Sequence, residues 1–487
     1  MIADLKPYAT YRAAEGDWLG QVPSHWIVRR MKYVVQENDS RSTTGDEQLL
    51  RVSQFTGVTQ RLRAAGQEEQ DTRAASLVGY KRVELDELVI NIMLAWNGSM
   101  GVSRYPGIAS PAYCVYRFRP VAQPWYFHHL LRSPAYKARI KAMSTGVVES
   151  RLRLYSDDLF RIEALLPPPE EQAAIVRFLD WANAQLERTI RAKRRVIALL
   201  TEQKQAIIHR AVTQGLDPTV SLKPSGIAWL GDIPAHWAAL QIRRVVSFVT
   251  SGSRSWANFY SDSGLIFLQS GNLGRAMSLN LSYIQHVQPP GGAEGVRTRV
   301  QTNDVLVCIT GAMTGNVALV DQELNAPAFV NQHVALIRAR PKMVEPRFLA
   351  YVLHSEVGRR QFKTNEYGGT KQGLGLGDVK NVFVVVPPLK EQREIVTQLD
   401  REVGAFQVAI SRLHREIDLL REYRTRLVAD VVTGKLDVRE AAAALPQEEP
   451  GSALEPDALG TGELGDEGDE GDDNTANGNE LDDDGKA

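Results

Sequence analysis

Basic side chains occur in three glycine-containing loops of the sequence, beside hydroxyl and aromatic residues. These loops are residues 146–153 (GVVESRLR), 251–256 (SGSRSW) and 366–373 (EYGGTKQG). Arg and Lys on a polar loop can donate hydrogen bonds to phosphate oxygens or to the edge of a guanine base. The loops therefore favour contact with DNA, and the alternative for each residue is an ordinary solvated charge. The candidate DNA-binding residues are Arg151, Arg153, Ser253, Arg254, Lys363 and Lys371.

The motifs that would give the chain chemistry of its own are missing from the sequence. It contains no GxxxxGK[ST] phosphate loop and no Asn-Pro-Pro or Asp-Pro-Pro tripeptide, which amino-methyltransferases use to hold a target amine. The nine histidines show no spacing typical of a metal site. We therefore expect no catalytic residue, no metal and no directly bound cofactor. A stand-alone DNA methyltransferase or endonuclease is the alternative from the enzyme class.

Charge is distributed unevenly along the 487 residues, although the formal net charge is only −1. Residues 446–487 carry 15 Asp and Glu and one Lys, a net charge of −14, so the rest of the chain carries +13. Residues 1–169 and 215–389 each carry a net charge of +5. A basic body of this kind indicates a polyanionic partner.

Other classes of protein are excluded by simple counts. No run of 18 apolar residues could form a membrane-spanning helix, and the N-terminal residues do not resemble a secretory signal. The only cysteines, Cys114 and Cys308, lie in separate apolar runs, which predicts two reduced core thiols and no disulfide framework. We expect a cytoplasmic protein with no membrane partner.

An internal duplication organises the sequence. Residues 18–26 (WLGQVPSHW) recur as 229–237 (WLGDIPAHW) at an offset of 211. Residues 167–172 (PPPEEQ) recur as 387–392 (PPLKEQ), and 213–217 (TQGLD) as 433–437 (TGKLD), both at 220, the offset that also aligns Arg151 with Lys371. Each half is thus a globular segment followed by one further element, and we expect the repeated tryptophans to serve packing.

The further element is predicted to be a long helix. Apolar residues recur at alternating steps of three and four over 176–211 and over 396–431, the spacing of a heptad seam. Each helix of about 40 residues would be about 60 Å long. Two such seams can bury each other in an antiparallel coiled coil, and the alternative is that each helix packs on its own domain. The residues expected in this helix pair include Leu179, Leu186, Ile190, Ile197, Leu399, Phe406, Ile410 and Ile417.

Strand-like runs punctuated by glycine turns, followed by shorter helical patches, give each globular segment an α+β character. The predicted fold is therefore two mixed α/β globular domains separated by two long antiparallel helices. The predicted boundaries are 1–168 and 215–386 for the domains, 169–214 and 387–437 for the helices, and 438–487 for a disordered acidic tail. The tail either keeps the chain soluble or shields the basic body as an acidic mimic.

These residues resemble the specificity (S) subunits of Type I restriction–modification systems over nearly the whole chain up to about residue 440. The resemblance rests on the two WLG…HW segments, the helix openings PPPEEQAAIVRFLD and PPLKEQREIVTQLD, and the closings TQGLD and TGKLD. Residues 252–273 look like one recurring type of target-recognition domain, and 144–155 look like the close of another. The acidic tail departs from the family pattern.

The resemblance implies a non-catalytic subunit with two target-recognition domains, each reading half of a split sequence in double-stranded DNA through the major groove. The helix pair would set the number of unread base pairs. Two modification subunits would bring S-adenosylmethionine and methylate adenine, and restriction subunits would add ATP- and Mg-dependent cleavage. The alternative outside this class is a coiled-coil scaffold that does not bind DNA.

Overall fold

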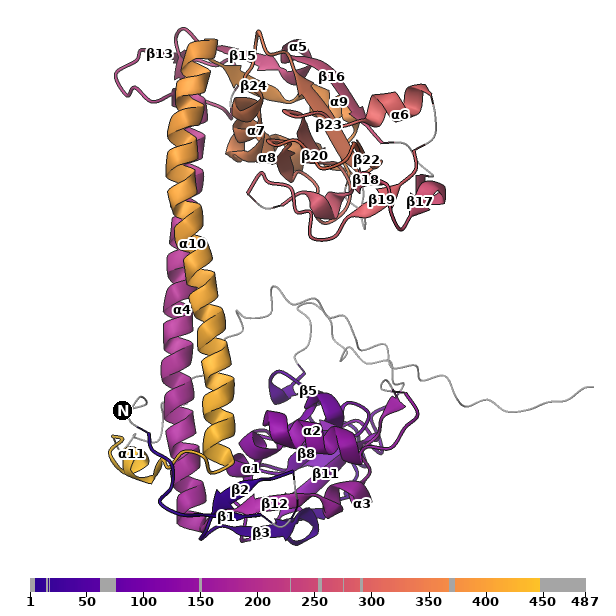
Figure 1. The fold of residues 1–487 in the computed structure, drawn as a ribbon, viewed down its shortest axis with the longest axis vertical. Coiled ribbons are helices and arrows are strands. Elements are labelled where there is room, and N and C mark those ends of the chain that lie inside the picture. The colour runs from indigo at the N-terminus through magenta and orange to yellow at the C-terminus, as the bar shows by residue number, and fades with distance from the viewer. Residues whose placement is uncertain are drawn as a thin grey trace, which may run out of the picture. The chain divides into compact units, whose positions relative to one another are not determined.

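The computed structural model describes residues 5–446 except 15, 17, 62–75, 149–150, 228, 253–255, 275, 290–291 and 368–372. The chain divides into two compact units, Met1–Phe178 with Val431–Ala487, and Leu179–Asp430. Each unit contains one mixed domain with its own four-stranded antiparallel sheet (Figure 1). None of the helices in the described part of the chain holds an 18-residue stretch apolar enough for a membrane span.

The sheet of the first unit has the strand order β4-β11-β8-β9. All four residues of the central strand β8, which reads Leu-Val-Ile-Asn, are buried, as expected of a strand covered on both faces. Prolines at the first helical positions open α1 and α2, where the missing N–H has no partner to lose. The elements are β1 (Tyr11–Ala13), β2 (Gln21–Pro23), β3 (Ile27–Arg30), β4 (Val35–Glu37), β5 (Leu50–Ser53), β6 (Gly57–Gln60), β7 (Lys81–Val83), β8 (Leu88–Asn91), β9 (Met100–Val102), β10 (Gly107–Ala109), β11 (Tyr113–Phe118), α1 (Pro124–Leu131), α2 (Pro134–Met143), α3 (Ser156–Arg161) and β12 (Glu163–Leu166).

The second unit repeats this scaffold with the strand order β16-β23-β20-β21 and adds a smaller sheet, β17-β19-β18-β22. Its elements are β13 (Leu222–Pro224), β14 (Asp232–Pro234), β15 (Ala238–Gln241), α5 (Ile242–Val245), β16 (Val246–Ser251), β17 (Tyr260–Ser261), β18 (Leu265–Leu268), β19 (Gln285–Val287), α6 (Ala293–Thr298), β20 (Val305–Cys308), β21 (Val317–Leu319), β22 (Ala328–Val330), β23 (Val334–Ala339), α7 (Pro346–His354), α8 (Glu356–Asn365), α9 (Leu376–Asn381) and β24 (Phe383–Val386). The strand pair β3-β12 corresponds to β15-β24, and α1–α2 correspond to α7–α8. The predicted α+β domain, used twice, is confirmed.

Two long helices, α4 (Pro169–Gln214) and α10 (Leu389–Val432), follow the two domains. Within the second unit they run antiparallel, because Lys193 pairs with Glu416 at 2.6 Å and Glu187, earlier in α4, pairs with Arg424, later in α10 (Figure 1). Every predicted seam position is buried or half-buried. The antiparallel coiled coil is therefore confirmed, and the alternative of two separately packed helices is wrong.

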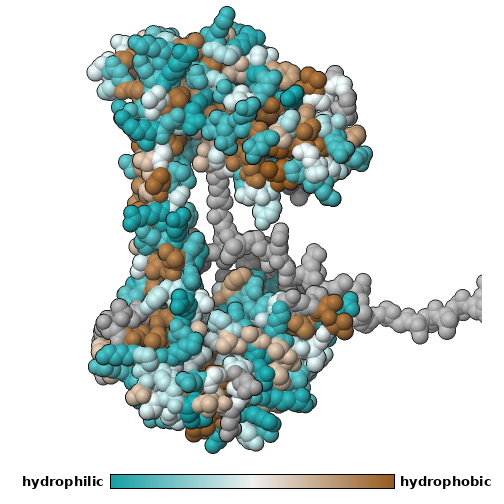
Figure 2. All heavy atoms as spheres, viewed as in Figure 1, coloured by the Kyte–Doolittle hydropathy of each residue, from teal (hydrophilic) through white to brown (hydrophobic). Residues whose placement is uncertain are grey.

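Hydrophobic residues also remain on the outside of the helix pair. Val196 and Leu199 of α4 and Val408, Leu419 and Tyr423 of α10 are exposed. Figure 2 shows hydrophobic spheres along this pair between hydrophilic ones. These residues lie outside the heptad seam, so the contact between the two helices does not account for them.

The acidic tail begins later than the sequence indicated. Residues 447–487 lie outside the described residues, but 438–446, which were assigned to the tail, form α11 (Arg439–Ala443) and its flanks. Val438, Ala442 and Leu445 are buried, and Arg177 Nη2 donates to the carbonyl oxygen of Leu445 at 2.7 Å. The apolar spacing of four and three residues makes this segment an amphipathic turn that packs on the first unit.

Candidate nucleic-acid interface

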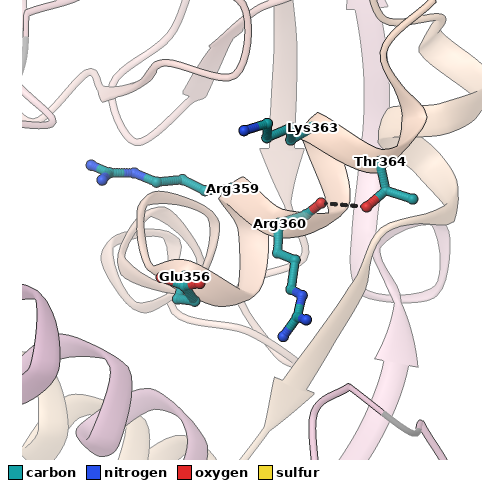
Figure 3. Close-up of a pocket in the computed structure, with 5 residues that line it drawn as sticks. All are labelled: Glu356, Arg359, Arg360, Lys363 and Thr364. Atoms are coloured by element: carbon teal, nitrogen blue, oxygen red, sulfur yellow. Dashed lines mark hydrogen bonds between the residues drawn. The ribbon is translucent and has the colours of Figure 1, made fainter.

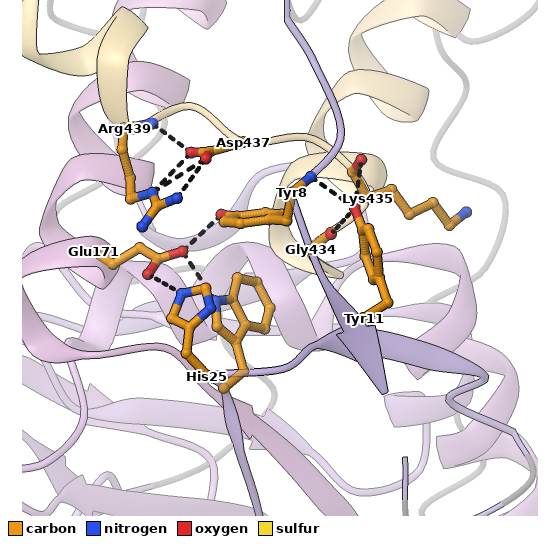
Figure 4. Close-up of polar contacts among 9 residues, drawn as sticks. Tyr8, Tyr11, His25, Glu171, Gly434, Lys435, Asp437 and Arg439 are labelled. Carbon is orange, nitrogen blue, oxygen red and sulfur yellow. Dashed lines mark hydrogen bonds and ion pairs between the residues drawn. The ribbon is translucent and has the colours of Figure 1, made fainter. Parts of the chain in front are cut away.

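Glu171, in the first turn of α4, joins the first domain to its long helix. Its carboxylate accepts hydrogen bonds from Tyr8 Oη at 2.7 Å and Trp26 Nε1 at 2.9 Å, and pairs with His25 Nε2 at 2.7 Å. Figure 4 shows Tyr8 and His25 converging on Glu171, with Arg439 and Asp437 beside them. Burial, and then the hydrogen bond to Glu171, raise the pKa of Tyr8 well above its usual value. The WLG…HW and PPxxEQ repeats therefore meet at one joint.

The second domain has the same joint in simpler form. Glu391 of α10 accepts from Trp237 Nε1 at 3.1 Å and pairs with His236 Nε2 at 2.8 Å. Trp26 and Trp237 are each only 1% exposed, which fits the expected packing role with a hydrogen bond in addition, whereas Trp18 and Trp229, the first tryptophans of the two repeats, are half-buried.

The glutamine that follows each joint glutamate is fully buried and makes the same three hydrogen bonds in both copies. Gln172 accepts from the N–H of Gln123 at 2.8 Å and donates to the carbonyls of Val121 and Pro167. Gln392 accepts from the N–H of Glu345 at 2.7 Å and donates to the carbonyls of Met343 and Pro387. The partners Gln123 and Glu345 are the N-cap residues of α1 and α7, so each long helix is locked to equivalent helices of its domain.

Trp26 and Trp237 each also contact the end of the other long helix. Gly434 and Gly215 follow α10 and α4 with φ of +77° and +78°, a left-handed conformation that glycine adopts without strain. A methyl group on Gly434 would lie 2.5 Å from Cδ of Pro23 and 3.0 Å from the Trp26 ring, and one on Gly215 would lie 3.2 Å from the Trp237 ring. Each domain is therefore fixed to both helices by the same residues.

Equivalent basic helices follow α1 and α7. Lys137 and Lys141 of α2 are four residues apart, as are Arg359 and Lys363 of α8, and the two pairs are related by an offset of 222. Residues four apart lie on one face of a helix. A pocket of about 390 Å³ lies along α8. It is lined by Glu356, Arg359, Arg360, Lys363 and Thr364. Figure 3 shows the three basic side chains leaving this helix.

Positive charge is concentrated around α8 beyond the pocket itself. Burial, and then the charge of Arg359, lower the pKa of Lys204, which is only 8% exposed. Burial, followed by the charges of Arg359 and Lys204, lowers the pKa of His354 to about 3, so this imidazole is neutral and lies 3.4 Å from Arg359 Nη2. Crowded cations with a single lining carboxylate form a site that favours phosphate.

The DNA-binding residues predicted from the sequence fall into three groups. Lys363 lies on α8 with Arg359 and Arg360, whereas Arg151 and Arg153 are exposed in a loop after α2 that is closed by a β-bridge between Thr145 and Arg153. An equivalent bridge, Tyr367 to Gly373, closes the loop after α8. Ser253, Arg254 and Lys371 lie outside the described residues.

Sequence reasoning missed Lys137, Lys141, Arg359 and Arg360, although their helical spacing was a usable signal. A second basic cluster lines a pocket of about 340 Å³ in the first domain. It contains Arg29, Arg30 and Lys32, with Tyr33 beside them. No group of three metal-binding side chains occurs among the residues that the structure describes.

The residues predicted for the helix pair are placed as follows. Leu186 and Ile190 of α4 are 7% and 2% exposed, and Ile197 is half-buried. The remaining buried members are Leu179, Leu399, Ile410 and Ile417, and Phe406 is half-buried.

Comparison with known proteins gives a consistent set of relatives. A family model described as a Type I restriction modification DNA specificity domain matches residues 296–411. The Type I restriction enzyme EcoBI specificity subunit of Escherichia coli is 26% identical over 57% of this chain, and the chain spans 58% of that relative's length. The MjaVIII specificity subunit of Methanocaldococcus jannaschii is 19% identical over 74% of this chain and 83% of its own length.

A solved structure supports the fold. It is named "Structural basis underlying complex assembly and conformational transition of the type I R-M system", and its matching chain is 19% identical. The match covers 85% of this chain and 99% of that chain, with a TM-score of 0.59.

Proposed function

Because the chain belongs to the family of Type I restriction–modification specificity subunits, we propose that it recognises a split sequence in duplex DNA, with one half read by each globular domain. It directs adenine methylation and restriction that are carried out by partner subunits. Its own residues supply binding and positioning, with no catalytic step.

The observation that best supports this proposal is the duplicated basic helix. α2 and α8 hold the same place after α1 and α7, and each presents two cations four residues apart. Side chains of this type neutralise phosphates along a duplex and fix the register of a protein without reading sequence. Two equivalent phosphate contacts are what a protein with two separate DNA-reading domains requires.

The proposal assigns different tasks to the other parts of the chain. The helix pair α4–α10 sets the number of unread base pairs between the half-sites, and the joints at Glu171 and Glu391 fix each domain to that pair. Two modification subunits bring S-adenosylmethionine, and restriction subunits bring ATP- and Mg-dependent cleavage. We place the complex in the cytoplasm, as expected for a Type I restriction–modification subunit.

The experiment that tests the proposed function compares methylated DNA motifs in host cells with and without this chain. When the chain is deleted, we expect one methylated motif to be lost. This motif should consist of two short half-sites separated by a fixed gap. An unchanged set of methylated motifs contradicts the proposal. A stand-alone methyltransferase would instead methylate DNA as the purified chain.

The role of the basic helices is tested with the complex of this chain and its host's modification subunits. Replacing Arg359 and Lys363 together by alanine should weaken binding to all sequences alike and reduce the slope of log K against log salt by about 2, since each phosphate contact contributes about 0.9. The matched control replaces Lys342 and Lys390, two exposed cations of the same unit, and should leave the slope unchanged. An equal change in both double variants contradicts the assignment.

A further inference from the structure

The two domains share one scaffold but differ in the segment between the first edge strand and the central strand of the four-stranded sheet. This segment runs from β4 to β8 in the first domain and from β16 to β20 in the second. The inference drawn here rests on the proposed function. If the two domains read different half-sites, each domain must distinguish its DNA sequence by residues that the shared scaffold does not repeat.

Each variable segment contains an equivalent β-hairpin. β5 pairs antiparallel with β6, and β18 pairs antiparallel with β19. Leu49, just before β5, bridges in parallel to Ile108 of β10, as Ile266 of β18 pairs in parallel with Ala328 of β22. The hairpins therefore hold the same place in the two domains, but their tips differ in length, with residues 54–56 in the first and 269–284 in the second.

The tip of the first hairpin presents an exposed aromatic residue on a fixed backbone. Phe55 is 71% exposed, yet its carbonyl accepts from Arg132 Nη2 at 3.0 Å. The same guanidinium donates to the carbonyls of Ser53 and Gln54, which holds the whole turn. Burial lowers the pKa of Arg132 only to about 10, so the group stays charged at neutral pH. A large apolar side chain on an immobilised loop loses little entropy on binding a partner.

The tip of the second hairpin has the same arrangement with other residues. Tyr283 is 89% exposed, and its carbonyl accepts from the side-chain amide of Asn272 at 2.8 Å. Asn272 is 7% exposed and also donates to the carbonyl of Asn280 at 3.0 Å. A polar side chain thus fixes the backbone of an exposed aromatic residue in both hairpins, the half-buried Arg132 in the first and the buried Asn272 in the second.

The first tip lies beside the basic helix of its domain. Arg132 donates to the carbonyl of Gly98 at 3.0 Å, and a methyl group on Gly98 would lie 2.9 Å from Cδ of Lys137. The exposed aromatic residue and the basic helix α2 are therefore connected through two residues, Arg132 and Gly98. Figure 1 shows β5 next to α2 in this domain.

The second tip is connected to α8 in a similar way. Asn316 Nδ2 donates to the carbonyl of Leu273 in the tip at 2.6 Å. The preceding residue, Gly315, lies against Phe362 of α8. A methyl group placed on Gly315 would be 3.5 Å from Cβ of Phe362. In both domains the exposed aromatic residue therefore belongs to a tip that is attached to the basic helix.

The residues around the two aromatics indicate the class of partner. Residues 53–57 (SQFTG) and 276–284 (AMSLNLSYI) contain hydroxyl, amide and apolar side chains and no carboxylate. A two-stranded ribbon fits the major groove of duplex DNA, and Phe makes apolar contact there with the methyl group of thymine. We propose that Phe55 and Tyr283 contact base edges in the two half-sites, with Arg132 and Asn272 as positioning residues.

The test uses the full chain in its complex with the host's modification subunits and reads the methylated motif. Phe55→Ala should reduce discrimination between bases by up to roughly 5- to 150-fold at one position of one half-site, the range that one mismatched base pair costs, and leave the other half unchanged. Tyr283→Ala should do the same in the other half-site. The matched controls are Leu85→Ala and Val296→Ala, which remove exposed apolar side chains from the same segments and should leave the motif intact.

The positioning residues are tested separately. Arg132 also donates to the carbonyl of Met100, which makes five carbonyl partners in all. Arg132→Lys keeps the charge but cannot reach all five, so it should relax the same position as Phe55→Ala. Amide hydrogen exchange of the peptide that carries α1 shows whether the domain is still folded. If Arg132→Lys unfolds it, Asn272→Ser provides the parallel test on the second hairpin.

The outcomes separate this proposal from the proposed function. If the Phe55→Ala or Tyr283→Ala chain directs methylation of the same motif as the wild type, the proposed aromatic contact is overturned. The proposed function is not affected by this result, because the wild-type chain still directs a split motif. A uniform loss in both half-sites also overturns the proposed aromatic contact, because it marks a non-specific contact. A wild-type chain that directs no split motif removes the proposed function, and the present proposal with it.

Discussion

Replacing Glu171 by alanine should destabilise the first unit and leave the second unaffected. The Glu171 side chain is 3% exposed, and it accepts from two buried donors, Tyr8 Oη and Trp26 Nε1. A hydrogen bond to a charged group contributes about 1.5–3 kcal/mol, and a buried donor left without a partner costs a similar amount. Since His25 is partly exposed and can turn to water, the two buried donors dominate, and we expect a loss of about 4 kcal/mol.

The second joint and an isosteric variant provide matched controls. The side chain of Glu391 is 26% exposed and that of its partner His236 is 46% exposed, so water replaces part of the loss and Glu391→Ala should cost about 1–2 kcal/mol. Glu171→Gln keeps an acceptor oxygen for Tyr8 and Trp26, and its amide can donate to His25. It should cost less than about 1 kcal/mol.

The assay is native-state hydrogen exchange, because two units need not unfold in one transition. Protection of the β3-β12 pair should fall in Glu171→Ala, whereas protection of the β15-β24 pair should be unchanged. Equal losses in Glu171→Ala and Glu171→Gln would show that the charge, and not the hydrogen-bonding geometry, holds the joint. Equal losses in Glu171→Ala and Glu391→Ala would refute the argument from burial.

Three further perturbations test other parts of the structure. Gly434→Ala should cost about 3 kcal/mol in the first unit, because its methyl group would meet Pro23 at 2.5 Å, whereas Gly20→Ala, also left-handed but with nothing within 4 Å, should cost about 1 kcal/mol in urea unfolding. The pKa of His354 is about 3 in the fold and about 6.5 when unfolded, so the unfolded chain binds more protons below pH 6.5. Stability of the second unit should therefore fall by about 2 kcal/mol between pH 7 and pH 5, and His354→Gln should remove this part of the pH dependence. Inserting four residues after Arg195 adds about 6 Å of helix and should lengthen the unread gap of the methylated motif by about one to two base pairs, with both half-sites unchanged. An unchanged gap on sequencing of the methylated sites would contradict the proposal that the helix pair sets the number of unread base pairs.

The helix pair could be predicted from the sequence because its signal is local and periodic. A heptad spacing kept over eleven seam positions in each copy, 176–211 and 396–431, determines which face is buried. Two equal seams in one chain determine their partner. The ion pairs of Lys193 with Glu416 and of Arg424 with Glu187 follow from that antiparallel register. Short strands such as β5 and β6 carry no comparable signal, because a sequence of only three or four residues is compatible with a strand, a helix or a turn.

The basic helices of the candidate nucleic-acid interface were harder to predict from the sequence, for a geometric reason. The offset between the halves is 222 at α2 and α8 but 220 at the long helices, because the loop closed by Thr145 and Arg153 is two residues longer than the loop closed by Tyr367 and Gly373. A search at 220 aligns Arg151 with Lys371, inside loops of unequal length, and misses the match of Lys141 with Lys363. The partners of Glu171 also lie 145 or more residues away in the sequence, beyond the reach of local patterns.

The discontinuous first unit has a consequence for synthesis of the chain. Residues 179–430 are contiguous, so the second unit can be completed as soon as they leave the ribosome. The first unit must wait for Val431 and the residues beyond it, since Val432 accepts the hydrogen bond from Tyr126 Oη and Gly434 covers Trp26. At about 5–20 residues per second this delay lasts about 10–50 s. A message truncated before codon 431 therefore yields a chain in which the second unit is complete and the first is not, and cellular proteases can degrade such a chain.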